Sequence, residues 1–361
     1  MSEIQDTGGR SESVLTTTLP RRRIGQTGLT VTELGLGAAT LGNLYAPMLD
    51  ANASATIRAA LAAGLLYVDT APYYGFGLSE QRVGAGLAAT TGAVISSKVG
   101  RLLRPIPREA VPSSRYGFHS SLPFEPFFDY TYDGVMRSWE ASLARMAVAR
   151  IDVLYVHDIG RATHGTTHRE YFSQLTGGGG LRALRSLRAC GAIGALGIGV
   201  NEIAVCLEVL RETDLDVILL AGRYTLLEQE ALDELFPEVH RRGTSIVIGG
   251  PYNSGILATG VIRTGGASLF DYAPPSPQII ERVRRIEITA QWHGVPLPAA
   301  ALQFPLAHPA VAAVIPGLDS PARVQQTVEW YRTGIPTEFW NDLRRQGLLR
   351  ADAPLPVGGG S

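Results

Sequence analysis

Residues 65–70, Leu-Leu-Tyr-Val-Asp-Thr, form a short apolar run that ends in polar side chains. A segment of helical period precedes this run at 51–63, another follows it at 79–88, and a second apolar run covers 93–99. Short apolar runs that alternate with helical segments are typical of strands in a parallel sheet that helices cover on both faces. This stretch therefore predicts an α/β fold.

The same alternation continues in both directions along the chain. The expected strands are 33–37, 65–70, 93–99, 151–157, 195–200, 216–221, 245–249 and 311–315, and the expected helices are 51–63, 79–88, 132–147, 181–189, 202–211, 228–242, 277–293 and 320–331. Eight strand–helix units predict a closed (β/α)8 barrel, the TIM barrel, rather than an open doubly wound sheet. No early strand is followed by a Gly-x-Gly-x-x-Gly motif and then an acidic residue about 20 positions later, which weighs against a Rossmann sheet.

Composition and chain length suit one domain with one large core. The chain has 361 residues, of which 45% are hydrophobic and 18% charged. We expect a single barrel domain at 19–353, with a disordered tail at 1–18 and a flexible tail at 354–361, because both ends are rich in Gly, Ser, Thr and Pro and carry no apolar period. A short N-terminal β-hairpin that turns at Gly28 should precede the first barrel strand.

Two βα connections, 100–131 and 250–276, are unusually long. The first is rich in proline and aromatic residues, and the second in Gly, Pro and Ser. Connections of this length in a compact domain are usually functional or disordered. The aromatic residues favour an ordered loop that covers a substrate at 100–131, and a mobile surface insertion is the alternative.

Charge and hydropathy exclude several classes of partner. The formal net charge is -1 with acidic and basic residues interspersed, so no basic stripe predicts nucleic-acid binding. No apolar run approaches the roughly 18 residues of a membrane span, and the polar start of the chain has no signal-peptide core. We expect a cytoplasmic protein, and no feature predicts an oligomeric state. Cys190, Cys206 and the scattered histidines show no metal-ligand spacing, which predicts no metal.

Four polar residues lie at or just beyond the ends of expected strands. Asp69 ends the second strand, Lys98 the third and His157 the fourth, and Tyr74 follows Asp69 by five residues. Each alone fits a turn residue, a solvated lysine or a packing residue. Together they converge on the carboxyl rim of a barrel, where α/β-barrel active sites are built.

These residue types suit interconversion of a carbonyl and an alcohol. A neighbouring ammonium on Lys98 is expected to lower the pKa of the Tyr74 phenol, which has a reference value of about 10. Asp69 would hold Lys98 by an ion pair, and His157 would donate a hydrogen bond to the substrate oxygen. Tyr74 would then relay the proton while a nicotinamide takes or gives the hydride.

The sequence resembles the aldo-keto reductase superfamily over about residues 22–331. The shared motifs are 25–31 (Gly-Gln-Thr-Gly-Leu-Thr-Val), 69–75 (Asp-Thr-Ala-Pro-Tyr-Tyr-Gly), Ser79-Glu80, Ser97-Lys98, 150–152 (Arg-Ile-Asp), His157-Asp158, 197–201 (Gly-Ile-Gly-Val-Asn) and 315–317 (Ile-Pro-Gly). The resemblance implies a (β/α)8 barrel, a nicotinamide nucleotide bound without a Rossmann motif, and a tetrad of Asp69, Tyr74, Lys98 and His157. Segments 128–135, 221–227 and 249–257 are most similar to the sugar 1-dehydrogenase branch, which includes D-threo-aldose or L-fucose, L-galactose and pyridoxal 4-dehydrogenases.

The resemblance also implies which residues bind the nucleotide. They are Thr40, Asp69, Asn201, Tyr252, Asn253, Ser254, Gly255, Leu257, Gly317, Asp319, Ser320, Arg323 and Gln326. Many relatives carry a serine at the position of Val200, a glutamine at Ala221 and a nicotinamide-stacking tyrosine at Gly249. Asn201 can still hold the carboxamide, and Tyr252 is the nearest candidate to replace the stacking tyrosine.

NAD is expected to be preferred over NADP. In NADPH-using relatives a Lys or Arg followed by Ser binds the 2′-phosphate after the eighth strand, and Asp319 occupies that cationic position here. A carboxylate repels a phosphate dianion but accepts a hydrogen bond from a free ribose 2′-hydroxyl. Ser320 and Arg323 weigh the other way, because they match groups that contact adenine or the phosphate. Asp319 as a simple residue at a helix N-terminus is the alternative.

The function that the resemblance implies is oxidation of a cyclic hemiacetal to a lactone with NAD. Expected substrates are an aldose such as L-fucose, D-arabinose or L-galactose, or pyridoxal, with specificity set by 100–131 and 250–276. One alternative is an NADPH-dependent reductase of aldehydes or ketones. Another is a non-catalytic, nucleotide-binding regulatory subunit like the channel-associated members of the superfamily, against which the intact tetrad weighs.

Overall fold

The computed structural model describes residues 18–356 except 89, 91 and 264–267. Most of the two expected tails, 1–17 and 357–361, therefore lies outside the described residues. Within the described residues, parallel strands form one eight-stranded sheet in the order β14-β13-β12-β11-β10-β5-β4-β3. Its strands are β3 (Leu36–Gly37), β4 (Tyr67–Asp69), β5 (Val94–Val99), β10 (Val153–His157), β11 (Ala195–Val200), β12 (Val217–Ala221), β13 (Ser245–Gly249) and β14 (Val311–Ile315).

The sheet closes on itself between its first and last strands. The Gly35 amide donates to the Val314 carbonyl at 3.0 Å, the Gly37 amide donates to the Pro316 carbonyl at 2.9 Å, and parallel bridges join residues 34 to 314 and 37 to 317. Closure removes both sheet edges. The expectation of a (β/α)8 barrel is confirmed.

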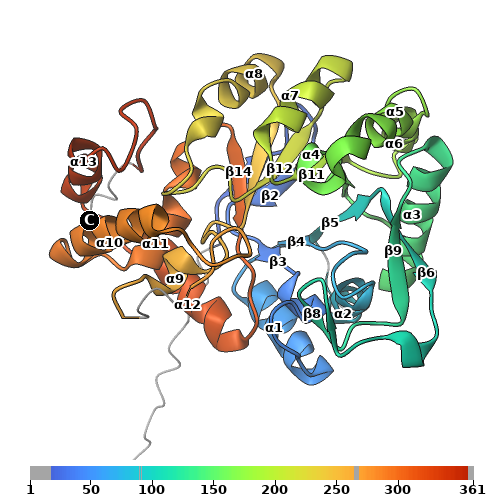
Figure 1. The fold of residues 1–361 in the computed structure, drawn as a ribbon, viewed down its shortest axis with the longest axis horizontal. Helices are drawn as coiled ribbons and strands as arrows, with labels where there is room; N and C mark the ends of the chain where they lie inside the picture. The colour runs from blue at the N-terminus through green and yellow to red at the C-terminus, as the bar shows by residue number, and fades with distance from the viewer. Residues whose placement is uncertain (1–17, 89, 91, 264–267, 357–361) are drawn as a thin grey trace, which may run out of the picture.

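Helices surround the barrel on the outside (Figure 1). The helices that follow successive strands are α1 (Asp50–Ala62), α2 (Leu78–Leu87), α3 (Tyr132–Met146), α6 (Gly180–Ala189), α7 (Ile203–Glu212), α8 (Leu235–Arg242), α11 (Leu297–Gln303) and α12 (Pro321–Arg332). The helix expected at 228–242 begins only at Leu235, because Pro237 is tolerated in a first helical turn but not in a helix interior.

Several elements were not expected from the sequence. Two short helices, α4 (Arg161–His164) and α5 (His168–Leu175), precede α6. The helix expected at 277–293 is α10 (Pro277–Trp292), but α11 follows it and is almost wholly buried. Because α11 is short and apolar on all sides, it carries no amphipathic pattern. The final helix, α13 (Thr337–Arg345), packs against α10.

The expected N-terminal hairpin is present as β1 (Arg21–Arg23) and β2 (Thr30–Thr32). The Gly25 amide donates to Ser245 Oγ at 2.8 Å and Arg22 Nη1 donates to the Val311 carbonyl at 2.8 Å, both at the starting ends of barrel strands. The hairpin therefore covers the end of the barrel opposite to the carboxyl rim.

The long connection at 100–131 is ordered, as its aromatic residues led us to expect. Its two ends pair as antiparallel strands β6 (Arg101–Pro105) and β9 (Phe124–Phe128). Between them, β7 (Ser114–Arg115) and β8 (Phe118–His119) form a second, smaller hairpin. The connection is thus built from two nested hairpins beside the barrel mouth, which sequence periodicity did not indicate.

The alternation of side chains along the strands sets the direction of the polar residues. Tyr67, Val94, Val153 and Tyr155 pack inside the barrel, whereas their neighbours in the chain pack outward against the helices. Because side chains in a strand alternate with a period of two, Asp69, Lys98 and His157 share the inward face with these core residues. The sequence pattern thereby directs three polar groups to the interior at the carboxyl end.

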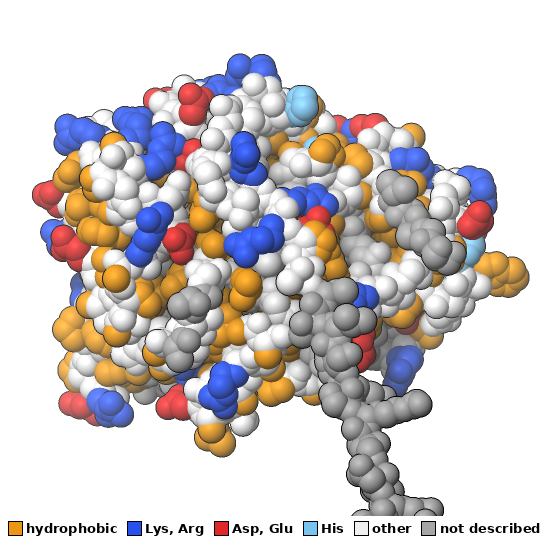
Figure 2. All heavy atoms as spheres, turned by 180° about the vertical axis from the view of Figure 1, so that it is seen from behind, with side chains coloured by type: hydrophobic (Ala, Val, Ile, Leu, Met, Phe, Trp, Pro, Cys, Tyr) orange, Lys and Arg blue, Asp and Glu red, His pale blue; other side chains and the backbone are white. Residues whose placement is uncertain are grey.

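The surface shows no dominant charge on the face drawn in Figure 2, where basic and acidic side chains are scattered among apolar ones. Among the helices that the structure describes, none has the length and apolar character of a membrane span.

Candidate active site

A cavity of about 620 Å³ opens at the carboxyl ends of the strands. Tyr74, Lys98 and His157 line it together with Gly199 and Asn201 from the end of β11 and the residue after it. Asp69 lies behind Lys98, 3% exposed. The structure thus brings the four sequence-predicted catalytic residues together around one cavity.

Lys98 and Asp69 form a buried ion pair. Lys98 Nζ lies 2.6 Å from Asp69 Oδ2 and donates a second hydrogen bond to the Thr70 carbonyl at 2.9 Å. Ser96 Oγ donates to the other carboxylate oxygen at 2.7 Å. Burial raises the pKa of Asp69 above its ordinary value, and the Lys98 ammonium opposes that shift. The lysine is therefore what offsets the desolvation of this carboxylate.

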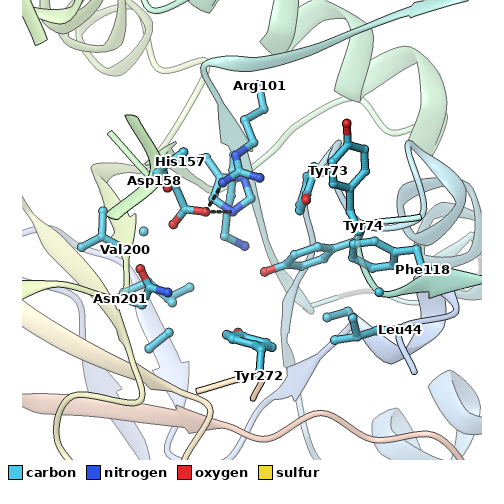
Figure 3. A pocket seen from close by; sticks show the side chains of 18 of the residues that line it. Leu44, Tyr73, Tyr74, Arg101, Phe118, His157, Asp158, Val200, Asn201 and Tyr272 are labelled. Carbon is cyan, nitrogen blue, oxygen red and sulfur yellow. Dashed lines mark hydrogen bonds and ion pairs between the residues drawn. The ribbon is translucent and has the colours of Figure 1, made fainter. Parts of the chain in front are cut away.

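The Tyr74 hydroxyl points into the cavity (Figure 3). Its ring lies 4.8 Å below Lys98 Nζ, and its centroid is 6.0 Å from that of His157. Gly75 follows with a φ of 63°, in the left-handed region that favours glycine, and a Cβ there would come within 2.4 Å of the Gly42 carbonyl oxygen. A glycine is therefore needed to turn the chain directly after Tyr74.

The pKa of Tyr74 differs from the sequence-based expectation. Burial raises it well above the ordinary value, and the charges of Asp69 and Asp158 raise it further. The expectation of a lowered pKa was wrong, because burial of the hydroxyl and the two nearby carboxylates raise it. Tyr74 is consequently a neutral phenol across the physiological pH range.

His157 is a neutral imidazole whose Nε2 faces Asp158 and the cavity. Burial lowers its pKa well below the ordinary value, and Arg101 and Lys98 lower it further. Its Nε2 lies 3.5 Å from Asp158 Oδ2, whereas its Nδ1 is buried without a hydrogen-bond partner. The nearby carboxylate favours the tautomer with the proton on Nε2, and this N–H faces the same cavity as the Tyr74 hydroxyl.

The sequence-based interpretation missed two kinds of cavity residue. One is a charged pair, Arg101 and Asp158, whose Nη2 and Oδ2 atoms lie 2.5 Å apart. The other comprises Tyr45, Tyr73 and Tyr272, which extend the aromatic wall that Tyr116 and Phe118 of the expected 100–131 loop form. The sequence did carry a signal for this pair. Arg101 lies three residues after Lys98, and Asp158 directly follows His157.

The model of the aldo/keto reductase family matches residues 33–346, which is most of the chain. This chain belongs to the aldo/keto reductase family. It is an oxidoreductase.

Two curated relatives of this aldo/keto reductase are dehydrogenases. A pyridoxal 4-dehydrogenase of Microbacterium luteolum is 47% identical over 338 residues, covering 91% of this chain and 98% of the relative. A D-threo-aldose 1-dehydrogenase of Pseudomonas sp is 38% identical over 327 residues, covering 89% and 96%. These relatives confirm the branch expected from the sequence.

A solved structure supports the fold. The aldo-keto reductase AKR11C1 from Bacillus halodurans, in its holo form, superposes with a TM-score of 0.70 at 23% identity, covering 93% of this chain and 98% of the other. At this identity the likeness concerns the fold alone.

Aldo/keto reductases use nicotinamide cofactors, and the residues beside Lys98 fit such a ring. Asn201 lines the cavity and carries an amide that both donates and accepts hydrogen bonds, as a carboxamide does. Gly199 and Ala221 leave the wall beside it open. At Gly199 a Cβ would come within 3.3 Å of Lys98 Cε, tighter than ordinary contact, so the glycine keeps this space free.

The expected adenosine-side residues gather at the start of α12. Ser320 Oγ accepts a hydrogen bond from the Arg323 amide at 3.2 Å and lies 3.2 Å from Asp319 Oδ1, and Arg323 Nη1 donates to Gln326 Oε1 at 2.8 Å. Ser320 is therefore the N-cap of the helix, and Asp319 directly precedes it. Asp319 remains exposed and free to meet a ligand. Nearby, Thr40 Oγ1 donates to the Leu318 carbonyl at 2.6 Å, next to Gly317.

Two expected cofactor residues in the segment after β13 have their side chains engaged within the fold. Asn253 accepts from Thr225 Oγ1 at 2.6 Å and donates to the Gly222 carbonyl at 3.1 Å, which ties the loops after β12 and β13 together. Leu257 is buried in the core, just after Gly255. The side chains of Asn253 and Leu257 are thus occupied within the fold.

The suggested replacement for the stacking tyrosine needs correction. Tyr252 is not among the residues that line the cavity, and its ring packs edge-on against Trp330 with 6.2 Å between centroids. Tyr272 lines the cavity instead, opposite Tyr74 in Figure 3. The Tyr272 amide donates to Ser254 Oγ at 3.0 Å, which fixes that loop. Sequence distance from the strand misled the choice, because Leu269 and Tyr272, late in the 250–276 connection, return to the cavity.

Proposed function

We propose that this aldo/keto reductase oxidises a cyclic hemiacetal to a lactone and that NAD takes the hydride. This proposal rests on one observation: Tyr74, Lys98 and His157 line one cavity, and five aromatic side chains form part of its remaining wall. An aromatic wall suits the flat face of a pyranose or pyridine ring. The names of the two curated relatives support the same chemistry, since aldoses and pyridoxal both exist as ring hemiacetals.

In the proposed reaction, each side chain has a separate task. His157 donates its Nε2 proton in a hydrogen bond to the reacting oxygen and orients it. During oxidation Tyr74 first releases its own phenolic proton to solvent, and the resulting phenolate takes the hydroxyl proton of the hemiacetal while the hydride leaves the same carbon; in the reverse direction the phenol returns that proton. Lys98, held by Asp69, keeps a positive charge beside the phenolate that forms transiently on Tyr74. The nicotinamide, when bound, supplies the hydride acceptor.

The substrate prediction is tested with purified protein and NAD. We expect NADH to form with at least one of pyridoxal, L-fucose, D-arabinose and L-galactose, and we expect the product to be the lactone by mass spectrometry. The matched control is the methyl glycoside of the best aldose, in which the hemiacetal hydroxyl is blocked and no NADH should form. Consumption of NADPH with simple aldehydes or ketones, without oxidation of any hemiacetal, would instead support the reductase alternative.

We further propose that NAD is preferred because Asp319 faces the ribose. The wild-type protein should favour NAD over NADP at least about tenfold in kcat/KM, which corresponds to roughly 1.4 kcal/mol. Asp319→Arg should reduce or reverse this preference, because it replaces a charge that repels the 2′-phosphate with one that attracts it.

The matched control for this test is Glu329→Arg, which makes the same charge change on an exposed residue at the other end of α12. It should leave the NAD preference unchanged. If Asp319 only stabilises the helix N-terminus, Asp319→Arg will lower the thermal midpoint while the NAD/NADP ratio stays constant. Equal use of both nucleotides by wild type would also contradict the proposal.

A further inference from the structure

Arg101 and Asp158 form a charged pair in the cavity wall. The proposed proton and hydride transfers assign no role to this pair. Arg101 is the first residue of β6, and Asp158 directly follows His157 at the end of β10. Both line the cavity, and Figure 3 shows Arg101 directed toward Asp158 and His157. The pair is therefore a second polar group within the same cavity as the proposed tetrad.

Packing holds the Arg101 guanidinium in place. Its central carbon lies 4.1 Å from the centroid of the Tyr73 ring and 5.3 Å from that of Phe128. Arg101 is only 7% exposed. Cations over aromatic faces are attracted by the ring quadrupole, so the side chain is fixed at the wall before a ligand arrives.

Asp158 is held in an unusual backbone conformation. Its φ is 45°, in the left-handed region that side chains other than glycine rarely adopt, and its amide donates to the Gly199 carbonyl at 3.0 Å. Such conformations cost of order 1–3 kcal/mol and persist where the surrounding structure enforces them, often at functional sites. Here the conformation accompanies a carboxylate shared between Arg101 and His157.

The ion pair with Asp158 does not engage all N–H donors of Arg101. A guanidinium carries five N–H donors. The structure joins Arg101 Nη2 to Asp158 Oδ2, whereas Arg101 Nε is buried without a partner. An unsatisfied buried donor costs about 1–3 kcal/mol, and a buried ion pair is by itself weak support for stability. An oxygen of a ligand in the cavity would reach a guanidinium N–H on the exposed part of Arg101 and not the buried Nε.

Distances within the site indicate which ligand oxygen this is. Asp158 Oδ2 lies 3.5 Å from His157 Nε2, the atom that we assign to the reacting oxygen. A ligand oxygen at His157 Nε2 and a second one at the charged pair would therefore be bound by adjacent groups of the cavity wall. Two hydroxyl groups close together on one small ring can occupy both places.

We propose that Arg101 and Asp158 form a subsite that binds the ring hydroxyl next to the reacting carbon, with Arg101 donating to this hydroxyl and Asp158 accepting from it. In an aldose this is the 2-hydroxyl; in the pyridoxal hemiacetal the corresponding group is the 3-hydroxyl of the pyridine ring, which is one carbon further from the reacting carbon. The inference rests on the proposed oxidation of a hemiacetal and adds the feature by which the site selects its substrate.

The test compares substrates with and without this hydroxyl in wild type and in variants. The substrate pairs are L-fucose with 2-deoxy-L-fucose, and pyridoxal with 3-deoxypyridoxal. Wild type should favour the hydroxylated member of the pair it oxidises by at least about tenfold in kcat/KM, the effect of one charge-assisted hydrogen bond. Arg101→Met should lose at least about tenfold on the hydroxylated substrate and much less on its deoxy analogue, so that the preference disappears.

Arg104→Met is the matched control, because Arg104 is an exposed arginine on the same strand and does not line the cavity. It should keep the wild-type preference. Arg101→Lys retains the positive charge beside Asp158 but not the fork of donors, and it serves if Arg101→Met does not fold. We expect Arg101→Lys to lose most of the preference.

The outcomes separate the two proposals. Oxidation of both members of a pair at equal kcat/KM by wild type, or an equal loss on both members in the Arg101 variants, would overturn the subsite but leave hemiacetal oxidation standing. If wild type oxidises no hemiacetal of either pair, the proposed function fails and the subsite fails with it.

Discussion

Tyr74→Phe is expected to lower kcat for hemiacetal oxidation at least about 100-fold while nucleotide affinity stays nearly unchanged. The substitution removes only the hydroxyl that points into the cavity. The ring remains to pack near His157 and Phe118, whose centroids lie 6.0 and 6.3 Å away, so the walls of the site should persist. The loss therefore isolates the proton relay from the shape of the cavity.

Steady-state kinetics and nucleotide titration by fluorescence check this result. The matched control is Tyr224→Phe, which removes a buried hydroxyl that has no hydrogen-bond partner and lies outside the cavity lining. This control should keep kcat. If Tyr74→Phe retained more than about a tenth of the wild-type kcat, Tyr74 would not be the general acid and base.

The pH profile gives a second readout for the same residue. Because burial raises the pKa of Tyr74 well above the ordinary value, the phenol stays protonated at neutral pH, and the fraction of phenolate grows with pH. Oxidation needs a proton acceptor, so kcat/KM for oxidation should rise with pH from about 7 into the alkaline range. This rise should be absent in Tyr74→Phe.

Lys98→Met is expected to lower the free energy of unfolding by about 3–5 kcal/mol, besides abolishing turnover, because it leaves a buried carboxylate without its counter-charge. Burial already raises the pKa of Asp69, and removal of the ammonium raises it further. The folded state of the variant then retains a proton that the unfolded chain has released. Its stability must therefore fall as pH rises, and the deficit relative to wild type should be larger at about pH 8 than at about pH 5.

Urea denaturation at both pH values measures this effect. The double variant Lys98→Met/Asp69→Asn removes the charge as well as its partner, and it should regain about half or more of the lost stability. A deficit in Lys98→Met that is independent of pH, or a double variant no more stable than the single one, would show that the loss comes from packing instead of an unpaired charge.

Much of the site was predictable because regular strands carry their side chains with a period of two. Asp69, Lys98 and His157 each end a short apolar run, so both their inward direction and their common rim followed from the pattern. Tyr74 was found by its fixed spacing from Asp69. These inferences needed no knowledge of how the loops fold.

The features that the sequence did not predict all depend on contacts between distant residues. Arg101 pairs with Asp158 across 57 positions, and β6 lies beside β9 only because the connection between them folds into hairpins. Tyr45, Tyr116 and Tyr272 have positive φ angles, which local preference disfavours for bulky side chains. Two predictions were wrong for the same reason, namely that Tyr252 replaces the stacking tyrosine and that the pKa of Tyr74 is lowered. Both depend on burial and charge at the barrel mouth, which exist only in the folded protein.

The origin of the cavity walls has an evolutionary consequence. The tetrad residues Asp69, Lys98 and His157 stand on barrel strands, whereas Tyr45, Tyr116 and Tyr272 come from three separate loops, two of which are joined by the hydrogen bond from the Tyr45 amide to the Gly117 carbonyl at 3.0 Å. A loop can be lengthened, exchanged or recombined without shifting the strands beneath it. Proteins that descend from this barrel can therefore acquire new substrates by exchanging the 100–131 loop as one unit, while Asp69, Lys98 and His157 on the strands are inherited unchanged.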